Sequence, residues 1–273
     1  MTKERKIERQ IEIAAPVEAV WKALTDAEEL MRWFPLDARV TPGPGGTVWF
    51  SWGAPYEGES QIEVWDPPRR LKLKDQWGGH AEKSNRPQVA MDFTLESAEG
   101  KTILRLVHSG FNSTADWDDE FEGTSRGWLQ EFLGLKHYLE HHLGETRRAV
   151  WSRVKVELSR EEVWQRVMSA DGLNLEGLKD GESFDRLTSA YERLQGRVLV
   201  CRPPEDFCAT LENCNEALLR VSVERWSKPR LHAEPNLWLS TYNIANSRVM
   251  SFQTNWTKLL TSLFPREFSG VNI

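Results

Sequence analysis

One pattern occurs near the start of each half of the chain, and this repeat limits the fold more than any other feature. Residues 11–30 (IEIAAPVEAVWKALTDAEEL) correspond without a gap to residues 154–173 (VKVELSREEVWQRVMSADGL). Trp21 of the first copy, for example, is matched by Trp164 of the second. A correspondence of this length indicates two domains of one ancestral type.

Each copy opens with an alternating apolar strand, followed by a helix whose apolar side chains recur at helical spacing. Ser159, with Glu162 three residues later, has the pattern of a capping box at the start of the second of these helices. The chain of 273 residues is long enough for two domains with separate hydrophobic cores. We therefore expect domains over residues 1–146 and 147–273, linked by the charged segment GETRR at 144–148.

Turn residues divide the rest of the first half into short segments. Pro35 is expected to stop a short helix at 28–35. Alternation of apolar and polar residues predicts strands at 47–52, 58–65, 69–74, 88–95 and 102–108, and helical spacing predicts a long helix at 125–143. This order predicts an α+β fold in which a curved antiparallel sheet wraps around the long C-terminal helix. Such a fold leaves room for a cavity between sheet and helix.

The second half follows the first but is shorter. RPP at 202–204 matches DPP at 66–68, TLEN at 210–213 matches TLES at 94–97, and LRV at 219–221 matches LRL at 104–106. These matches predict a deletion that covers the equivalent of residues 75–87 and a strand with it. They also align His108 of the first half with Val223 of the second. We expect the cavity of the second domain to be reduced or filled.

Five segments together resemble one known superfamily: IEIAAPVEAVWKALTD at 11–26, MRWFP at 31–35, GESQIEVWDPPRRLKLK at 58–74, TILRLVHSGF at 102–111 and SRGWLQEFLGLKHYLE at 125–140. They are similar to START-like proteins (SRPBCC, Bet v 1-like, helix-grip), in the branch of heat-shock protein 90 ATPase activator homologues. The resemblance covers residues 7–143 and is weaker over residues 154–264. It implies a pocket for hydrophobic small molecules, in a superfamily that includes cyclases, lipid carriers, resistance proteins and chaperone cofactors.

His108 is the titratable residue that we single out. By alternation from Leu104 and Leu106, its side chain points toward the space between sheet and helix. An imidazole there can hold the polar end of a ligand or act as an acid or base. The alternative is a structural histidine bonded to a neighbouring backbone group or tryptophan. The residues expected to line the cavity are Val89, Met91, Phe93, Leu104, Leu106, His108, Phe111, Trp128 and Phe132.

Two polar groups are weaker candidates for a site. His137, His141 and Glu145 recur at four-residue steps on the long helix, as metal ligands can, but a solvated face near a helix C-terminus is the preferred interpretation. The acidic segment ADWDDEFEG at 115–123 is interpreted as a solvated loop and helix start. We expect no metal and no cofactor.

The cysteines and two of the tryptophans allow further expectations. Cys201, Cys208 and Cys214 fit no zinc spacing. Cys201 and Cys208 flank the turn RPPEDF and could face each other across a hairpin, but buried free thiols are the default. Trp49 and Trp65 fall out of phase with the apolar faces of their strands, so we expect them on the outer face or against the second domain.

Charge and hydropathy limit the partners. The net charge of −6 and the pI near 5.7 argue against binding to nucleic acid or to an anionic membrane surface. The N-terminal segment MTKERKIERQ lacks the apolar core of a signal peptide, and no stretch approaches the ~18 apolar residues of a membrane span. We expect a cytoplasmic protein that does not insert into membranes.

Three functions agree with these observations. The favoured one is a binding module whose first domain holds a hydrophobic or aromatic small molecule, without enzymatic activity. The second is an interaction with a protein partner, as a chaperone cofactor makes. The third is a cyclase or hydrolase that uses His108. The sequence names neither the ligand nor the oligomeric state.

Overall fold

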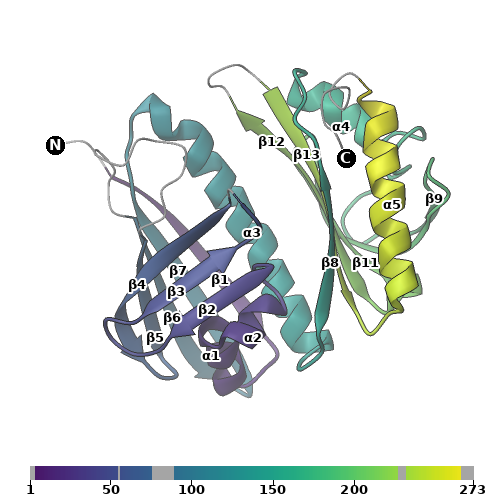
Figure 1. Ribbon diagram of the computed structural model, residues 1–273. Coiled ribbons are helices and arrows are strands. Elements are labelled where there is room, and N and C mark those ends of the chain that lie inside the picture. The colour runs from purple at the N-terminus through teal and green to yellow at the C-terminus, as the bar shows by residue number, and fades with distance from the viewer. Residues whose placement is uncertain (1–3, 55, 76–88, 227–231, 266–273) are drawn as a thin grey trace. The chain divides into compact units, whose positions relative to one another are not determined.

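The computed structural model describes residues 4–54, 56–75, 89–226 and 232–265, and the chain divides into two compact units, Met1–Glu145 and Thr146–Ile273. Each unit consists of one antiparallel sheet with a long helix at its C-terminal end (Figure 1). The α+β class and the tandem helix-grip fold predicted from the sequence are confirmed.

The first unit contains β1 (Arg5–Ile13), α1 (Val17–Thr25), α2 (Ala27–Met31), β2 (Asp37–Thr41), β3 (Thr47–Ser51), β4 (Glu57–Asp66), β5 (Arg70–Asp75), β6 (Ala90–Ala98), β7 (Lys101–Phe111), a short 3₁₀ turn η1 (Ala115–Trp117) and α3 (Asp118–His141). Its strands follow the order β1-β7-β6-β5-β4-β3-β2. α3 runs along one face of this sheet (Figure 1).

Residue alternation explains which face of the sheet meets α3. In β6, Met91, Phe93 and Leu95 are buried, whereas the intervening Asp92 and Thr94 are partly exposed. On α3, one stripe of buried apolar side chains is spaced by three and four residues, as one face of a helix requires: Trp128, Phe132, Leu135 and Leu139.

Two details of the first unit differ from expectation. β2 was not predicted, because the short segment DARVT alternates only through Ala38 and Val40. α3 begins at Asp118 and not at residue 125, so the acidic segment forms η1 and the expected helix start, without the expected loop. Acidic residues in the first turn stabilise a helix through its dipole, which explains why this segment is helical.

A β-bulge corrects the expectation for Trp65. The register between β4 and β5 shifts between Ile62 and Val64, and Trp65 then pairs with the buried Leu71. The extra residue returns Trp65 to the face of Ile62, where its ring packs edge-on against Trp21 of α1 at 5.3 Å. Alternation alone could not reveal this change of phase.

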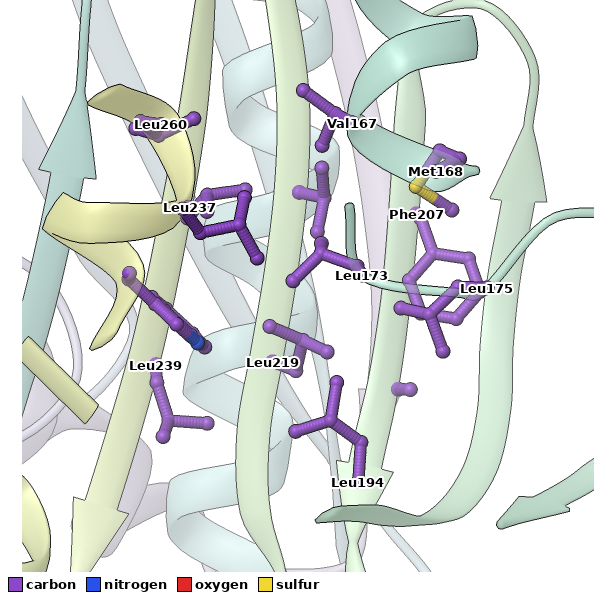
Figure 2. Close-up of a cluster of buried hydrophobic side chains, with 14 of the residues drawn as sticks. Val167, Met168, Leu173, Leu175, Leu194, Phe207, Leu219, Leu237, Leu239 and Leu260 are labelled. Atoms are coloured by element: carbon purple, nitrogen blue, oxygen red, sulfur yellow. The ribbon is translucent and has the colours of Figure 1, made fainter. Parts of the chain in front are cut away.

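The second unit contains β8 (Arg147–Arg153), α4 (Arg160–Met168), β9 (Ser183–Leu187), β10 (Arg193–Arg202), β11 (Asp206–Leu211), a 3₁₀ turn η2 (Glu212–Cys214), β12 (Ala217–Trp226), β13 (His232–Tyr242) and α5 (Asn246–Leu263). Its strand order is β8-β13-β12-β11-β10-β9. The predicted capping box at Ser159 and Glu162 is present. Leucines, valines and aromatic residues from the strands, α4 and α5 form one buried core (Figure 2).

The strand order corrects the expected correspondence between the two halves. β8 pairs with β13 as β1 pairs with β7, so β13 is the counterpart of β7 and β12 is that of β6. The match of LRV at 219–221 to LRL at 104–106 was therefore wrong, because LRV lies in β12. The TLEN match was wrong for the same reason, since Thr210 lies in β11, the counterpart of β5. Three-residue matches do not determine strand pairing.

The strand that is missing from the second unit also differs from the one expected. A single strand, β9, lies beyond β10, where the first unit has both β3 and β2 beyond β4, so the missing strand is an edge strand. β11 and β12 are joined by residues 212–216 alone. The compared segment 75–87 lies, apart from Asp75, outside the described residues.

The linker expected at 144–148 is shorter than predicted, because β8 already begins at Arg147. Val156, which was expected in the opening strand of the second domain, forms an isolated bridge to Ala233.

The three cysteines are free thiols. In the β10–β11 hairpin Cys201 pairs with Phe207 and Cys208 pairs with Val200. Cys201 and Cys208 are therefore offset by one residue and lie on opposite faces of the hairpin, so they do not face each other. Burial raises the pKa of the Cys208 thiol to about 12, which keeps it protonated and unreactive.

Gly196 provides a test of the close strand approach in the second sheet. A Cβ atom at this position would lie 1.7 Å from the carbonyl oxygen of Thr210, an approach that the backbone cannot accommodate without moving. Gly196→Ala should therefore destabilise the second unit by at least about 2 kcal/mol. Hydrogen exchange of β10 and β11 in the full chain measures this change.

Gly127→Ala is the matched control, because a Cβ atom on Gly127 in α3 meets nothing within 4 Å. Alanine is the better helix former, so this variant should stabilise α3 by up to about 1 kcal/mol. Equal effects of the two substitutions would contradict the close approach of β10 to β11.

Candidate functional site

His108 lies in the middle of an apolar row that crosses the first sheet. The strand register places it between Ile7 of β1 and Met91 of β6, and Met91 is followed by Leu73 of β5. All four side chains are buried, and His108 itself is only 6% exposed. The row therefore combines one hydrogen-bonding group with apolar neighbours on both sides.

The residues expected at the cavity come mainly from three elements. β6 contributes Met91 and Phe93, β7 contributes Leu104, Leu106, His108 and Phe111, and α3 contributes Trp128 and Phe132, and all of these are buried. Val89 precedes β6 and is half-buried. Their assignment to a ligand site stays a prediction.

Trp128 joins the sheet to the helix. Its ring lies 5.7 Å from Phe93 of β6 and 5.9 Å from Phe132 of α3, both in edge-to-face arrangements. It also stacks with Phe34 at 5.9 Å. Phe34 in turn contacts Trp52 at 5.0 Å. Sequence reasoning missed Phe34 and Trp52 as neighbours of the site, although the MRWFP segment that contains Phe34 was part of the family resemblance.

A hydrogen bond between Trp128 and His108 sets the protonation pattern of the imidazole. The indole Nε1–H of Trp128 donates to Nδ1 of His108 at 2.9 Å. An indole nitrogen can only donate, so Nδ1 accepts and bears no hydrogen. Burial lowers the pKa of His108 from 6.5 to about 4, so the ring is neutral at pH 7 and its hydrogen resides on Nε2.

The Nε2–H group of His108 is buried and has no hydrogen-bond partner among the described residues. Most buried polar groups in proteins are hydrogen-bonded, and an unpaired one costs roughly 1–3 kcal/mol. The alternative of a purely structural histidine accounts for Nδ1, which Trp128 satisfies, but it does not account for Nε2. The geometry therefore leaves one unused donor at the centre of the apolar row.

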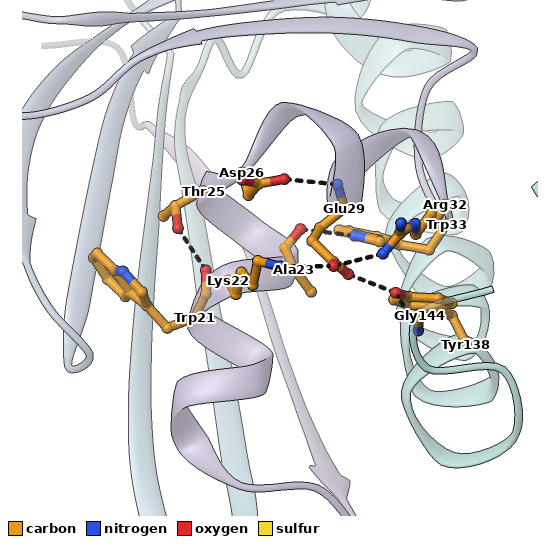
Figure 3. Close-up of polar contacts among 10 residues, drawn as sticks. All are labelled: Trp21, Lys22, Ala23, Thr25, Asp26, Glu29, Arg32, Trp33, Tyr138 and Gly144. Carbon is orange, nitrogen blue, oxygen red and sulfur yellow. Dashed lines mark hydrogen bonds and ion pairs between the residues drawn. The ribbon is translucent and has the colours of Figure 1, made fainter. Parts of the chain in front are cut away.

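A polar network fixes one end of α3 (Figure 3). The buried carboxylate of Glu29 in α2 accepts hydrogen bonds from Arg32 at 2.6 Å and from the Tyr138 hydroxyl at 2.5 Å. Tyr138 in turn accepts from the backbone N–H of Gly144 at 3.0 Å. Burial and the Glu29 carboxylate raise the pKa of Tyr138, so the phenol keeps its proton and continues to donate. This network is a structural anchor.

The histidines near the end of α3 differ from the expected solvated face. His141 is exposed, but His137 is buried, and their rings lie 5.0 Å apart. His142, which the sequence did not single out, is hydrogen-bonded through Nδ1 to Glu145 at 2.8 Å. No group of three or more His, Cys, Asp or Glu side chains that could hold a metal ion occurs in the described part of the chain.

The second unit replaces both members of the His108–Trp128 pair. Ile7 pairs with His108, and its repeat counterpart Val150 pairs with Leu239. The buried stripe of α5 repeats the spacing of the α3 stripe, which places Phe252 at the position of Trp128. Leu239 and Phe252 are both fully buried. The counterpart of His108 is therefore Leu239, not Val223 as expected, and the polar pair has become an apolar one.

A sheet that wraps around a long C-terminal helix, with a largely apolar interior, defines a START-like helix-grip protein. Residues 14–140 match the family model of the activator of Hsp90 ATPase homolog 1-like proteins. The first unit therefore carries the sequence pattern of this family, as the sequence resemblance indicated. No curated protein matches the chain.

Several solved structures are similar to the chain. The Aha1 dimer from Colwellia psychrerythraea is 24% identical, with a TM-score of 0.45, and the match covers 51% of this chain and 99% of that one. The di-domain aromatase/cyclase BexL of the BE-7585A biosynthetic pathway is 15% identical, with a TM-score of 0.43, over 98% of this chain and 100% of that one. DynU16, of the dynemicin biosynthetic locus, is 16% identical with a TM-score of 0.43 over 94% and 97% of the two chains.

None of the helices among the described residues combines the length and apolar character that a membrane crossing requires.

The His108–Trp128 hydrogen bond predicts strong coupling between two substitutions. His108→Leu should leave the indole N–H of Trp128 buried and unpaired, at a cost of about 1–3 kcal/mol in the stability of the first unit. The double variant His108→Leu, Trp128→Phe restores the combination found in the second unit and should cost less than the sum of the single variants. Denaturation of the full chain, followed by hydrogen exchange of β7, measures this cycle. Additive costs would contradict the coupling.

His108 also predicts a pH dependence of stability. Between pH 6.5 and about 4 the unfolded chain binds a proton at this histidine and the folded chain does not. The contribution of His108 to the free energy of unfolding should therefore fall as the pH decreases through this window, by at most about 3 kcal/mol. The stability difference between wild type and His108→Leu at pH 7 and pH 4 isolates this contribution from that of the carboxylates. A difference that does not change with pH would contradict a neutral, buried His108.

Proposed function

We propose that the first unit binds an apolar small molecule between its sheet and α3, with His108 as the polar contact. The observation that supports this proposal is the unpaired Nε2–H of His108 among buried apolar side chains. A bound molecule with a hydrogen-bond acceptor would recover the cost of this unpaired group. The neighbours Ile7, Met91 and Leu73 fit a ligand whose remaining surface is apolar.

The environment of His108 favours binding over proton transfer. With its pKa lowered to about 4, the imidazole of His108 is a weak base. At pH 7 almost none of it is in the charged imidazolium form that acts as a general acid. In the described ranges, Trp128 is its hydrogen-bond partner, and acid–base catalysis usually requires a second group that orients or charges the imidazole. Cyclase or hydrolase chemistry at His108 is for this reason the weaker hypothesis.

The family match favours a second candidate, an interaction with a chaperone of the Hsp90 type. The match covers residues 14–140, and the family description refers to activation of the Hsp90 ATPase. Comparison of the ATPase rate of a purified Hsp90 with and without the full chain tests this candidate. An unchanged rate would remove it.

Methionine methyl groups provide site-resolved reporters for ligand binding. Met91 lies directly opposite His108 in the strand register, whereas Met168 is buried in the second core and Met250 is exposed on α5. Titration of the full chain, labelled with ¹³C at the methionine methyls, with fluorenone, an apolar ketone without an N–H donor, should shift the Met91 resonance in a saturable manner. Met168 and Met250 should stay unchanged, because they lie outside the proposed site.

The same spectrum contains its own control. Shifts at Met168 without a shift at Met91 would place binding in the second unit and contradict the proposal. Non-saturating shifts of the exposed Met250 alone would indicate adsorption to the surface, and would contradict it as well.

A further inference from the structure

His108 presents one fixed kind of hydrogen-bonding group. A histidine free to change tautomer can offer either a donor or an acceptor at a given ring nitrogen. Here the Trp128 N–H occupies Nδ1 at 2.9 Å, and only the tautomer with hydrogen on Nε2 can accept that bond. The group left over at the centre of the apolar row is therefore a donor and cannot act as an acceptor without loss of the Trp128 bond.

From this geometry we propose that the site selects apolar molecules that end in a neutral hydrogen-bond acceptor without a donor, such as a ketone, quinone or ester carbonyl. The inference rests on the proposed function and deepens it. Trp128 is a positioning residue in this account, because it acts on the ligand through the tautomer of His108.

Other polar groups fit this position less well. A ligand N–H would meet the Nε2–H of His108 donor against donor, and both groups would stay unpaired. A carboxylate would be an acceptor, but the row of Ile7, Met91 and Leu73 beside the neutral imidazole supplies no positive charge. The guanidinium of Arg9, which lies on the same face of β1, already donates to Ser125 of α3. Burial of an ion without a countercharge is far more costly than burial of a carbonyl. A neutral carbonyl avoids both penalties.

Three planar tricyclic probes of nearly equal shape separate these cases. Fluorenone has a carbonyl, fluorene has a methylene group, and carbazole has an N–H at the corresponding position. Dissociation constants are measured for each probe from the Met91 methyl shift in the full chain. We expect fluorenone to bind about tenfold more tightly than fluorene. Carbazole should bind no more tightly than fluorene.

Two variants test whether His108 and Trp128 produce this order. His108→Leu, which introduces the residue found at the equivalent position of the second unit, should reduce the preference for fluorenone to about twofold or less while fluorene still binds. Trp128→Phe leaves the imidazole in place but frees Nδ1, so both tautomers become accessible and carbazole should gain affinity relative to fluorene. The ¹⁵N spectrum of His108 should show protonated Nε2 in the wild type and a mixture of tautomers in Trp128→Phe.

The outcomes separate the inference from the proposed function. Equal affinities of the three probes at Met91, or a preference for carbazole, would overturn the inference and leave the binding function intact. If none of the probes shifts Met91, both fail. The order in the wild type decides the inference even if a variant does not fold, and a ¹⁵N spectrum with protonated Nδ1 in the wild type would overturn it independently.

Discussion

The packing of one long helix against one face of an antiparallel sheet is the constraint on which each unit depends. In the first unit this contact is centred on Trp128, whose ring meets Phe93, Phe132 and Phe34. A tryptophan supplies a large apolar area together with one N–H that requires a partner when buried. Because His108 supplies that partner, the same contact that stabilises the helix also fixes the tautomer of the imidazole. Structure and candidate function are thus linked through one hydrogen bond.

The two ends of α3 are held in different ways. Toward its C-terminus, Glu29 and Tyr138 connect α3 to α2 through buried hydrogen bonds, and the Gly144 N–H adds the segment beyond the helix. The first turns of α3 contain no buried residue between Asp118 and Gly127. Buried polar networks rigidify the elements that they join, whereas helix turns without buried side chains open more easily. Local opening of α3 is therefore expected to begin in the turns before Trp128.

Duplication has produced two units with the same scaffold and different interiors. The second unit keeps the sheet, the opening helix and the long helix, but it lacks an edge strand and has Leu239 and Phe252 in place of His108 and Trp128. Replacement of both partners of a buried hydrogen bond by apolar residues can be nearly neutral for stability, whereas loss of one partner is costly. This asymmetry explains how the same fold can carry a polar pair in one unit and an apolar pair in the other. The first unit has the polar pair and is the one in which we place the ligand.

The sequence by itself determined the duplication, the α+β class, the inward position of His108 and the stripe of α3. These features are local, because strand and helix periods assign each side chain to a face without knowledge of its partners. Only the tertiary structure decided that Trp128 bonds to His108, that Phe34 and Trp52 lie beside them, that a bulge turns Trp65 inward, and that Leu239 is the counterpart of His108. These features depend on contacts between residues far apart in the chain and on strand register, and neither periodicity nor short motif matches encode those.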